Sequence, residues 1–324
     1  ISVASTPASV TGNTMTITSI TLADPTKAST SPIAQFLLSG EEVFVADYNF
    51  VSTGGTSVID RLVFEVLEAS NGTKDSKGTL TSVIVDGKSF PVINGVVTAT
   101  GLNIEIPAGH AGKTVQVKAV TSHVGMGGIE SNLPSILRIT GYRYAGGNTV
   151  VTQTGINVQA NQMNIVGGMP SVDVISETGP LTGNGTHRLV KVKVTANGGP
   201  VRLRELPVKI TSTGTAEITT DTNNIEVRVD NNVTTTTNES FAVGAGNTNT
   251  VQVKFDGTGY NIAKGQTVEF HVYAPIAGVG TTATSIRAEL GPKTGLKWTD
   301  VAGNKAGITG ANVYSSNFSV IEKK

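Results

Sequence analysis

The stretch YNIAKGQTVEFHVYAP, residues 260–275, decides the fold class of this chain. A tight turn is predicted at Lys264-Gly265, because glycine adopts the backbone angles that such turns require. After the turn, Val268, Phe270 and Val272 occupy every second position. This alternation is typical of a β-strand with one face buried. The stretch therefore predicts a turn that leads into a half-buried strand.

The same pattern occurs earlier as IEIPAGHAGKTVQVKAV, residues 104–120. Further short matches follow in the same order along the chain. The matching segments are Gly112-Lys113-Thr114-Val115 with Gly265-Gln266-Thr267-Val268, Ser135-Ile136 with Ser285-Ile286, Thr140-Gly141-Tyr142-Arg143-Tyr144 with Thr294-Gly295-Leu296-Lys297-Trp298, and Ile59-Asp60-Arg61-Leu62 with Leu203-Arg204-Glu205-Leu206. They predict a tandem duplication with a period of roughly 150 residues.

The remaining sequence contains short strand patterns separated by turn signals, and no credible amphipathic helix. Asp86-Gly87 and Asn94-Gly95 are strong hairpin markers, because both residue types tolerate a positive φ. This spacing predicts an all-β fold, with two tandem immunoglobulin-like β-sandwich domains and an extended N-terminal arm. The expected divisions are residues 1–32 for the arm, 33–166 for the first sandwich, 167–186 for a linker or crossover, and 187–324 for the second sandwich.

Composition narrows the class of protein. Charges are balanced, with 24 basic and 24 acidic residues. The sequence contains no block of basic residues, so it gives little support for binding to nucleic acid or to an anionic membrane. Cysteine is absent, which favours a bacterial or archaeal surface protein over a disulfide-reinforced eukaryotic one. The chain starts at Ile1 and contains no apolar run near 20 residues. We expect a secreted protein without a membrane span whose signal has been removed, although a trimmed chain would look the same.

No catalytic pattern is recognisable, so we predict that the chain is not an enzyme and carries no cofactor. There is no cysteine nucleophile or Gly-x-Ser-x-Gly motif, and the four histidines lie far apart in sequence. Residues 221–230, DTNNIEVRVD, and the pair Asp300 and Asn304 offer oxygen ligands for calcium. The first segment lacks the glycine of an EF-hand loop, which favours an Asx-rich turn, and we predict no metal site.

Two other groups of side chains allow alternative interpretations. Trp298, Tyr142 and Tyr144 could form a carbohydrate platform, but their recurrence at one place in both repeats favours core packing. Five Asn-x-Ser/Thr triplets are candidate glycosylation acceptors, at Asn71, Asn184, Asn232, Asn238 and Asn317.

The N-terminal arm is almost uncharged and carries a strand pattern at Thr14-Met15-Thr16-Ile17-Thr18. A strand of this kind can add to an open sheet edge of another chain and bury its alternate side chains there. The residues expected to be buried in such a donor strand are Val10, Met15, Ile17, Ile20 and Leu22. The alternative is that residues 14–22 form the first strand of their own domain.

The hairpin and closing-strand patterns described above resemble the tandem immunoglobulin-like repeats of secreted bacterial surface proteins, over residues 33–321. This resemblance implies a cell-surface or appendage role and supplies no catalytic residues. We therefore expect an extracellular structural subunit that polymerises head to tail with copies of itself. The alternative is an adhesin or carbohydrate-binding module that contacts surface glycans through the loops at residues 122–132 or 231–238. A glycan-active enzyme is the third hypothesis.

Overall fold

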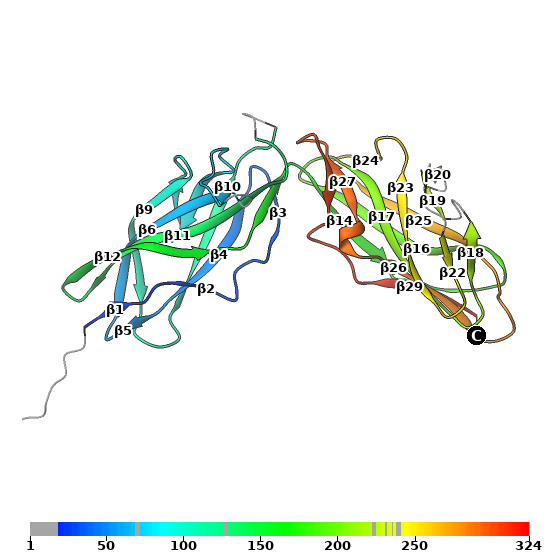
Figure 1. Ribbon diagram of the computed structural model, residues 1–324, viewed down its shortest axis with the longest axis horizontal. Helices are drawn as coiled ribbons and strands as arrows, with labels where there is room; N and C mark the ends of the chain where they lie inside the picture. The colour runs from blue at the N-terminus through cyan, green and yellow to red at the C-terminus, as the bar shows by residue number, and fades with distance from the viewer. Residues whose placement is uncertain are drawn as a thin grey trace, which may run out of the picture.

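The computed structural model describes residues 19–68, 72–125, 129–221, 225–230, 232–234, 236–237 and 241–323. Its regular structure is β-strand except for one 3₁₀ turn, η1 (Lys293–Gly295), so the predicted all-β class is confirmed. Figure 1 shows the strands gathered into two halves that lie end to end. Within the described ranges, no helix has the length and apolar character needed to cross a membrane.

The N-terminal half is a sandwich of two sheets with a small two-stranded pair at one end. The first sheet has the order β2-β4-β10-β7-β8, and the second has the order β3-β13-β11-β6-β9, with β12 beside β11. The strand bounds are β1 (Thr21–Leu22), β2 (Thr26–Lys27), β3 (Gln35–Leu38), β4 (Glu42–Phe50), β5 (Ser52–Thr53), β6 (Ser57–Glu68), β7 (Leu80–Val85), β8 (Lys88–Pro91), β9 (Val96–Ile106), β10 (Lys113–Thr121), β11 (Leu133–Gly146), β12 (Thr149–Gln159) and β13 (Met163–Val166).

The C-terminal half repeats this plan. One sheet has the order β14-β16-β25-β19-β20, and the other has the order β15-β29-β26-β17-β23-β21, extended by β24, β27 and β28. The bounds are β14 (Met169–Ile175), β15 (Thr178–Pro180), β16 (Gly185–Asn197), β17 (Val201–Thr213), β18 (Ile218–Asp221), β19 (Glu226–Val229), β20 (Asn232–Thr234), β21 (Thr236–Thr237), β22 (Phe241–Val243), β23 (Thr248–Phe255), β24 (Tyr260–Ile262), β25 (Thr267–Ile276), β26 (Thr284–Leu290), β27 (Lys297–Asp300), β28 (Lys305–Thr309) and β29 (Phe318–Lys323).

Strand pairing supports the duplication inferred from the short sequence matches. Tyr144 lies opposite Ile59 in the N-terminal half, and Trp298 lies opposite Leu203 in the C-terminal half. In the aligned segments Ile59 corresponds to Leu203 and Tyr144 corresponds to Trp298, so the same two positions pair in both halves. Each half also has one parallel pair, β13 with β3 and β29 with β15. The Ser-Ile match is the exception, because Ser135 is buried in one half whereas Ile286 is buried in the other.

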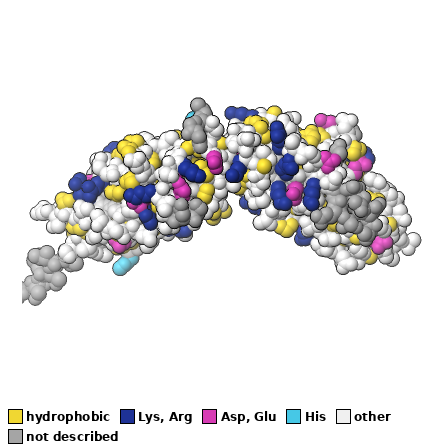
Figure 2. Space-filling model, turned by 45° about the horizontal axis from the view of Figure 1, so that its top comes forward, with side chains coloured by type: hydrophobic (Ala, Val, Ile, Leu, Met, Phe, Trp, Pro, Cys, Tyr) yellow, Lys and Arg dark blue, Asp and Glu magenta, His cyan; other side chains and the backbone are white. Residues whose placement is uncertain are grey.

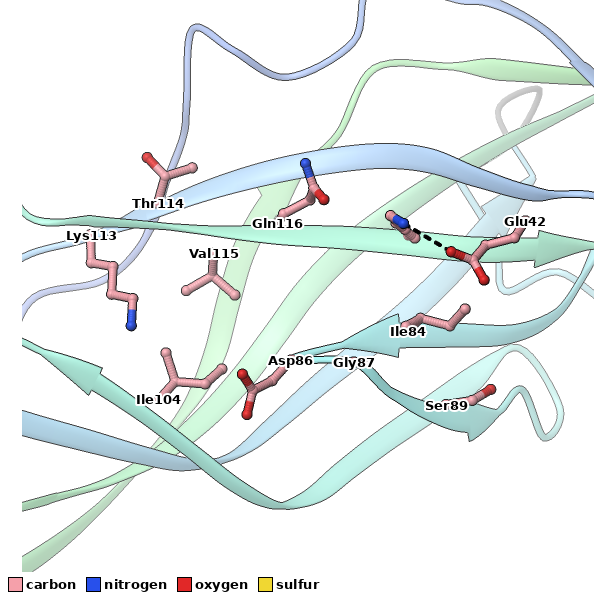
Figure 3. Close-up of a pocket in the computed structure, with 11 residues that line it drawn as sticks. Glu42, Ile84, Asp86, Gly87, Ser89, Ile104, Lys113, Thr114, Val115 and Gln116 are labelled. Carbon is pink, nitrogen blue, oxygen red and sulfur yellow. Dashed lines mark hydrogen bonds and ion pairs between the residues drawn. The ribbon is translucent and has the colours of Figure 1, made fainter.

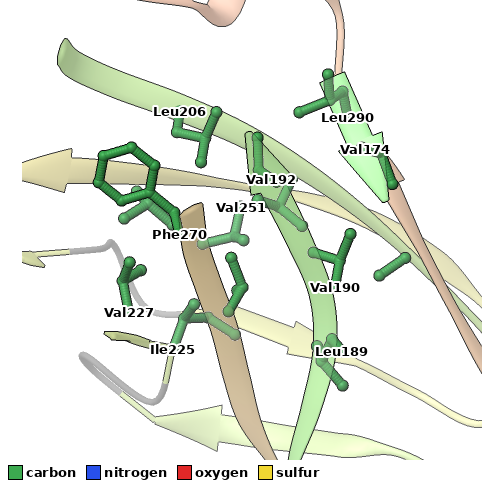
Figure 4. Close-up of a cluster of buried hydrophobic side chains, with 14 of the residues drawn as sticks. Val174, Leu189, Val190, Val192, Leu206, Ile225, Val227, Val251, Phe270 and Leu290 are labelled. Carbon is green, nitrogen blue, oxygen red and sulfur yellow. The ribbon is translucent and has the colours of Figure 1, made fainter. Parts of the chain in front are cut away.

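Each half has its own core between its two sheets. Figure 4 shows this core in the C-terminal half, where Val190 and Val192 of β16 face Leu206 of β17 and Val251 of β23. Their alternation along β16 buries one face of the sheet, as the sequence pattern predicts. The separate cores explain why the chain needs no disulfide or metal to form either sandwich.

Residues 167–186 are not a linker, in contrast to the prediction. β14 pairs with β16 along its whole length, and β15 pairs with β29, so most of this segment belongs to the sheets of the C-terminal half. Pro170 is tolerated because β14 is an edge strand, where a missing N–H donor costs no ladder bond on the open side. Only Gly167 and Gly168 remain between β13 and β14.

The junction between the halves is built around the carboxylate of Asp300, which has no exposed surface. It accepts hydrogen bonds from the Ser131 hydroxyl at 2.5 Å, from the Gly167 amide at 2.7 Å and from the Gly168 amide at 3.1 Å. The Gly303 amide donates a fourth bond at 3.3 Å. One side chain of the C-terminal half thus binds the N-terminal half and both connecting residues.

A second contact supports the same junction. The Asn312 side chain accepts from the Phe36 amide at 2.8 Å and donates to the Phe36 carbonyl at 2.6 Å. The Phe36 ring packs edge-on against Trp298, with 5.8 Å between ring centroids. Polar and apolar contacts together hold the halves in one orientation.

Candidate functional site

A groove opens at the side of the N-terminal sandwich because β7 is shorter than its neighbour β10. β7 has six residues and β10 has nine, and their pairing covers only residues 117–121 of β10. β7 ends where Asp86 takes a φ of 52°, which starts the turn into β8. On this side, residues 113–116 of β10 therefore have no strand partner in the described part of the chain.

The groove has a volume of about 580 Å³, an apolar floor and a polar rim. Figure 3 shows Lys113, Val115 and Ile104 directed into the space between β10 and β9, whereas Thr114 and Gln116 point the other way. Val115 is 5% exposed and Ile104 is 4% exposed. Side chains of an added strand would therefore meet aliphatic residues from both sheets.

β9 forms the opposite wall of the groove and is the edge of its sheet. Eight of its 11 residues, 96–100 and 104–106, pair with β6 on one side, and among the described residues no other strand pairs with its outer edge. Natural proteins protect edges with charge, proline or irregular backbone. β9 contains no proline, has Glu105 as its single charged residue, and bulges at residues 101–103, where the Gly101 carbonyl accepts from Lys88 Nζ. Such an edge can accept another strand.

An equivalent groove of about 680 Å³ lies in the C-terminal half. β25 pairs with β19 only at residues 271–273, so residues 267–270 have no strand partner on that side within the described ranges. Asp230, the residue directly after β19, has a φ of 51°, and Asp86 follows β7 in the same way with a φ of 52°. The unpaired segments 113–116 and 267–270 are the beginnings of the two strands that revealed the duplication.

The two grooves differ in ways that bear on strand addition. Tyr260 occupies the place of Ile104, and its ring packs against Phe270 with 5.0 Å between centroids. The counterpart of β9 is divided into β23 and β24 by a turn at residues 256–259, and β21 pairs with the end of β23. The C-terminal edge is therefore interrupted by a turn and partly covered, whereas the N-terminal edge is one strand with a bulge at residues 101–103.

The first described residues contact the sandwich of their own N-terminal half. This differs from the prediction that residues 1–32 form a separate arm. Leu22 is buried, and its carbonyl accepts from the Tyr142 hydroxyl at 3.0 Å. The same hydroxyl lies 3.2 Å from Asp24 Oδ1. Burial first, and then the nearby Asp24 carboxylate, raises the pKa of Tyr142 above its usual value, which keeps this donor protonated.

Of the five predicted donor residues, Ile20 and Leu22 thus lie against their own half. Val10, Met15 and Ile17 fall outside the described residues. The root of the arm is defined here as residues 19–22, and the arm proper as residues 1–18.

The root continues past the end of the sandwich. β1 pairs antiparallel with β5, with Thr21 opposite Thr53 and Leu22 opposite Ser52. The chain before Thr21 therefore runs along the turn Gly54-Gly55, where a Cβ on Gly54 would come within 2.5 Å of the Ser19 carbonyl oxygen. The described chain consequently begins, at Ser19, at the outer end of the N-terminal half.

Replacing Gly146 by Ala is expected to displace the root, because the added Cβ would lie 2.8 Å from Ile20 Cγ2 and 3.0 Å from its Cβ. Overpacking of this kind costs about 1–3 kcal/mol, which should increase proteolysis near residues 19–22. Gly179→Ala is the matched control, since its Cβ meets Ile321 Cγ2 at an ordinary 3.5 Å. Equal protease resistance in the two variants would show that Ile20 does not pack on Gly146.

The residues considered above as metal ligands or as a carbohydrate platform have other environments. In the described part of the chain, no three His, Cys, Asp or Glu residues are placed to hold a metal ion. Asp300 is the junction residue, not part of an open calcium loop with Asn304, and the segment 221–230 is only partly described. His187 bonds to the Gly183 carbonyl oxygen, and His271 lies 3.7 Å from Glu269.

Trp298, Tyr142 and Tyr144 are 0%, 1% and 3% exposed, so they are core residues and not an exposed sugar platform. Within the loop at residues 122–132, Ser122 and Ser131 are buried at its two ends, whereas His123, Gly125 and Glu130 between them are exposed.

The surface offers little other chemistry that could define a site. Figure 2 shows basic and acidic side chains interspersed on one face, with hydrophobic side chains scattered between them. Asn184, Asn232 and Asn317 are exposed, whereas Asn71 and Asn238 lie outside the described residues. Sequence reasoning missed the grooves, although Asp86-Gly87 and Asp230-Asn231 both marked an early strand end.

No family model matches the chain, and no curated protein matches its sequence. Among solved structures, it is similar to the C-terminal domain of the AgI/II polypeptide BspA from Streptococcus agalactiae, with 11% identity, coverage of 84% of this chain and 95% of that chain, and a TM-score of 0.25. It is also similar to the major pilin subunit BcpA of Bacillus cereus, with 13% identity, coverage of 81% of this chain and 62% of that chain, and a TM-score of 0.24. Likenesses with such low TM-scores support neither a common fold nor a common function.

Proposed function

We propose that this chain is a non-enzymatic structural subunit of an extracellular filament or surface assembly. It polymerises head to tail when the arm of one chain adds a strand to another chain. The observation that carries this proposal is the unpaired outer edge of β9 beside an apolar groove, in a chain whose arm has strand alternation and no charged side chain in residues 1–18. Main-chain hydrogen bonds and burial of alternate side chains would stabilise the contact.

Head-to-tail contacts of this kind do not close on themselves unless the rotation between subunits allows a ring, so they generate filaments. Localisation outside the cell is part of the proposal, and it is supported by the cysteine-free, low-charge composition.

Deleting residues 1–18 is expected to abolish filaments while leaving both sandwiches folded, because the described cores contain none of these residues. Negative-stain electron microscopy of the full and shortened chains measures assembly, and circular dichroism measures the fold. Filaments formed equally by both chains would exclude the arm as the polymerising element.

Monodisperse particles from both chains would instead favour the adhesin or carbohydrate-binding alternative. A glycan array would then test that alternative directly.

A further inference from the structure

We propose that the acceptor for the arm is the outer edge of β9 in the N-terminal half of a second copy, and that the equivalent groove in the C-terminal half is a duplicate that no longer takes a strand. This inference rests on the proposed function, which it deepens by naming the partner surface. It assigns a distinct role to each of the two duplicated grooves.

The length and alternation of the arm fit this edge. Residues 14–18 form a five-residue alternating pattern, and residues 102–106 of β9 alternate as well, with Leu102, Ile104 and Ile106 buried and Asn103 and Glu105 exposed. A strand added there places Met15 and Ile17 over Ile104 and Val115, because side chains two residues apart share a face. Its threonines then lie on the outer face, beside the exposed Asn103 and Glu105.

The C-terminal groove is unsuited to the same strand. At the place of Ile104 it holds Tyr260, whose ring is packed against Phe255 and Phe270, so an incoming side chain meets an aromatic ring instead of an aliphatic side chain. The turn at residues 256–259 also interrupts its edge, where Gly257 and Gly259 have φ angles of 60° and 97°. The N-terminal edge is a single strand with one bulge and offers the longer surface for pairing.

The occupant comes from a second copy and not from the same chain. The root runs along the turn Gly54-Gly55 and follows directly after the strand pattern that ends at Thr18. A reversal into the chain's own groove requires at least about two turn residues, and the two residues before β1, Ser19 and Ile20, are instead held against Gly54, Gly55 and Gly146. The glycine and asparagine that favour a turn, Gly12-Asn13, come before the strand pattern.

The absence of cysteine allows a direct test by disulfide trapping. Two full-length variants, Thr16→Cys and Glu105→Cys, are mixed under oxidising conditions and examined on non-reducing gels. Cysteines on neighbouring strands can bridge when their Cα atoms are roughly 4.4–6.8 Å apart. Asn261→Cys is the matched control, because Asn261 is exposed and holds the equivalent position in the C-terminal half.

We expect a covalent dimer from Thr16→Cys with Glu105→Cys, in at least about tenfold excess over Thr16→Cys with Asn261→Cys. Since the pairing register is not fixed by the argument, Asn103→Cys is run in parallel. Equal or greater trapping with Asn261→Cys would overturn the assignment of the two grooves. A single chain carrying both Thr16→Cys and Glu105→Cys that closes only within itself would overturn the second-copy occupant.

The two levels of inference fail differently. Arm-dependent filaments without trapping at Asn103 or Glu105 would place the acceptor elsewhere and leave the proposed function intact. Filaments that do not need residues 1–18 would refute strand donation itself.

Discussion

Replacing Ile17 by Asp is expected to abolish assembly while leaving the subunit folded. In the proposed contact, Ile17 enters the groove over Ile104 and Val115, and an unpaired carboxylate buried there costs at least about 4 kcal/mol. That loss weakens association by roughly a thousandfold. Sedimentation of freshly purified chains and electron microscopy measure this loss of assembly.

The matched control is Thr16→Asp, which adds the same charge one residue away on the outward row. We expect it to assemble, at most more slowly, because its carboxylate remains in water. Equal loss of assembly in both variants would mean that charge in the arm, and not burial at alternate positions, governs the contact.

Asp300→Ala should release the two halves from their fixed orientation. The substitution leaves the amides of Gly167 and Gly168 without their acceptor, and each unsatisfied buried donor costs about 1–3 kcal/mol. A loss of about 3 kcal/mol corresponds to more than a hundredfold faster hydrogen exchange at these two amides. Small-angle X-ray scattering should show a broader distribution of interatomic distances.

Asp256→Ala provides the comparison, since it removes a carboxylate from the exposed turn between β23 and β24. We expect its scattering curve and the exchange of both glycine amides to match those of the unaltered chain. Unchanged exchange in Asp300→Ala would show that the connecting glycines are held by other contacts, such as Asn312 with Phe36.

Local alternation and turn chemistry were sufficient to predict the sandwiches. Val190 and Val192 face the core as their spacing requires, and Asp86-Gly87 forms the expected hairpin turn. The segments matched by the repeat alignment occupy corresponding places in the strand pairs of the two halves. These features depend on residues close together in sequence or on a pattern present twice.

The failures concern features that depend on distant residues. Met169–Ile175 was taken as part of a linker because Gly and Pro surround a short apolar run, and only pairing with β16 makes it a strand. Asp300 was considered a calcium ligand, but its partners come from Ser131 and the glycines after β13. The grooves arise from unequal strand lengths across a sheet, which no single segment encodes.

The parallel pairs β3–β13 and β15–β29 have a mechanical consequence. In the N-terminal half, the chain passes through β3 near its start and leaves through β13, and these strands run side by side over four residue pairs. A pull along the chain therefore loads their hydrogen bonds in shear, so the bonds resist together instead of opening one after another. The same geometry recurs where β29 ends the C-terminal half. Tension across either half would therefore be resisted by these paired strands together, which also carry the core residues Leu37 and Ile321.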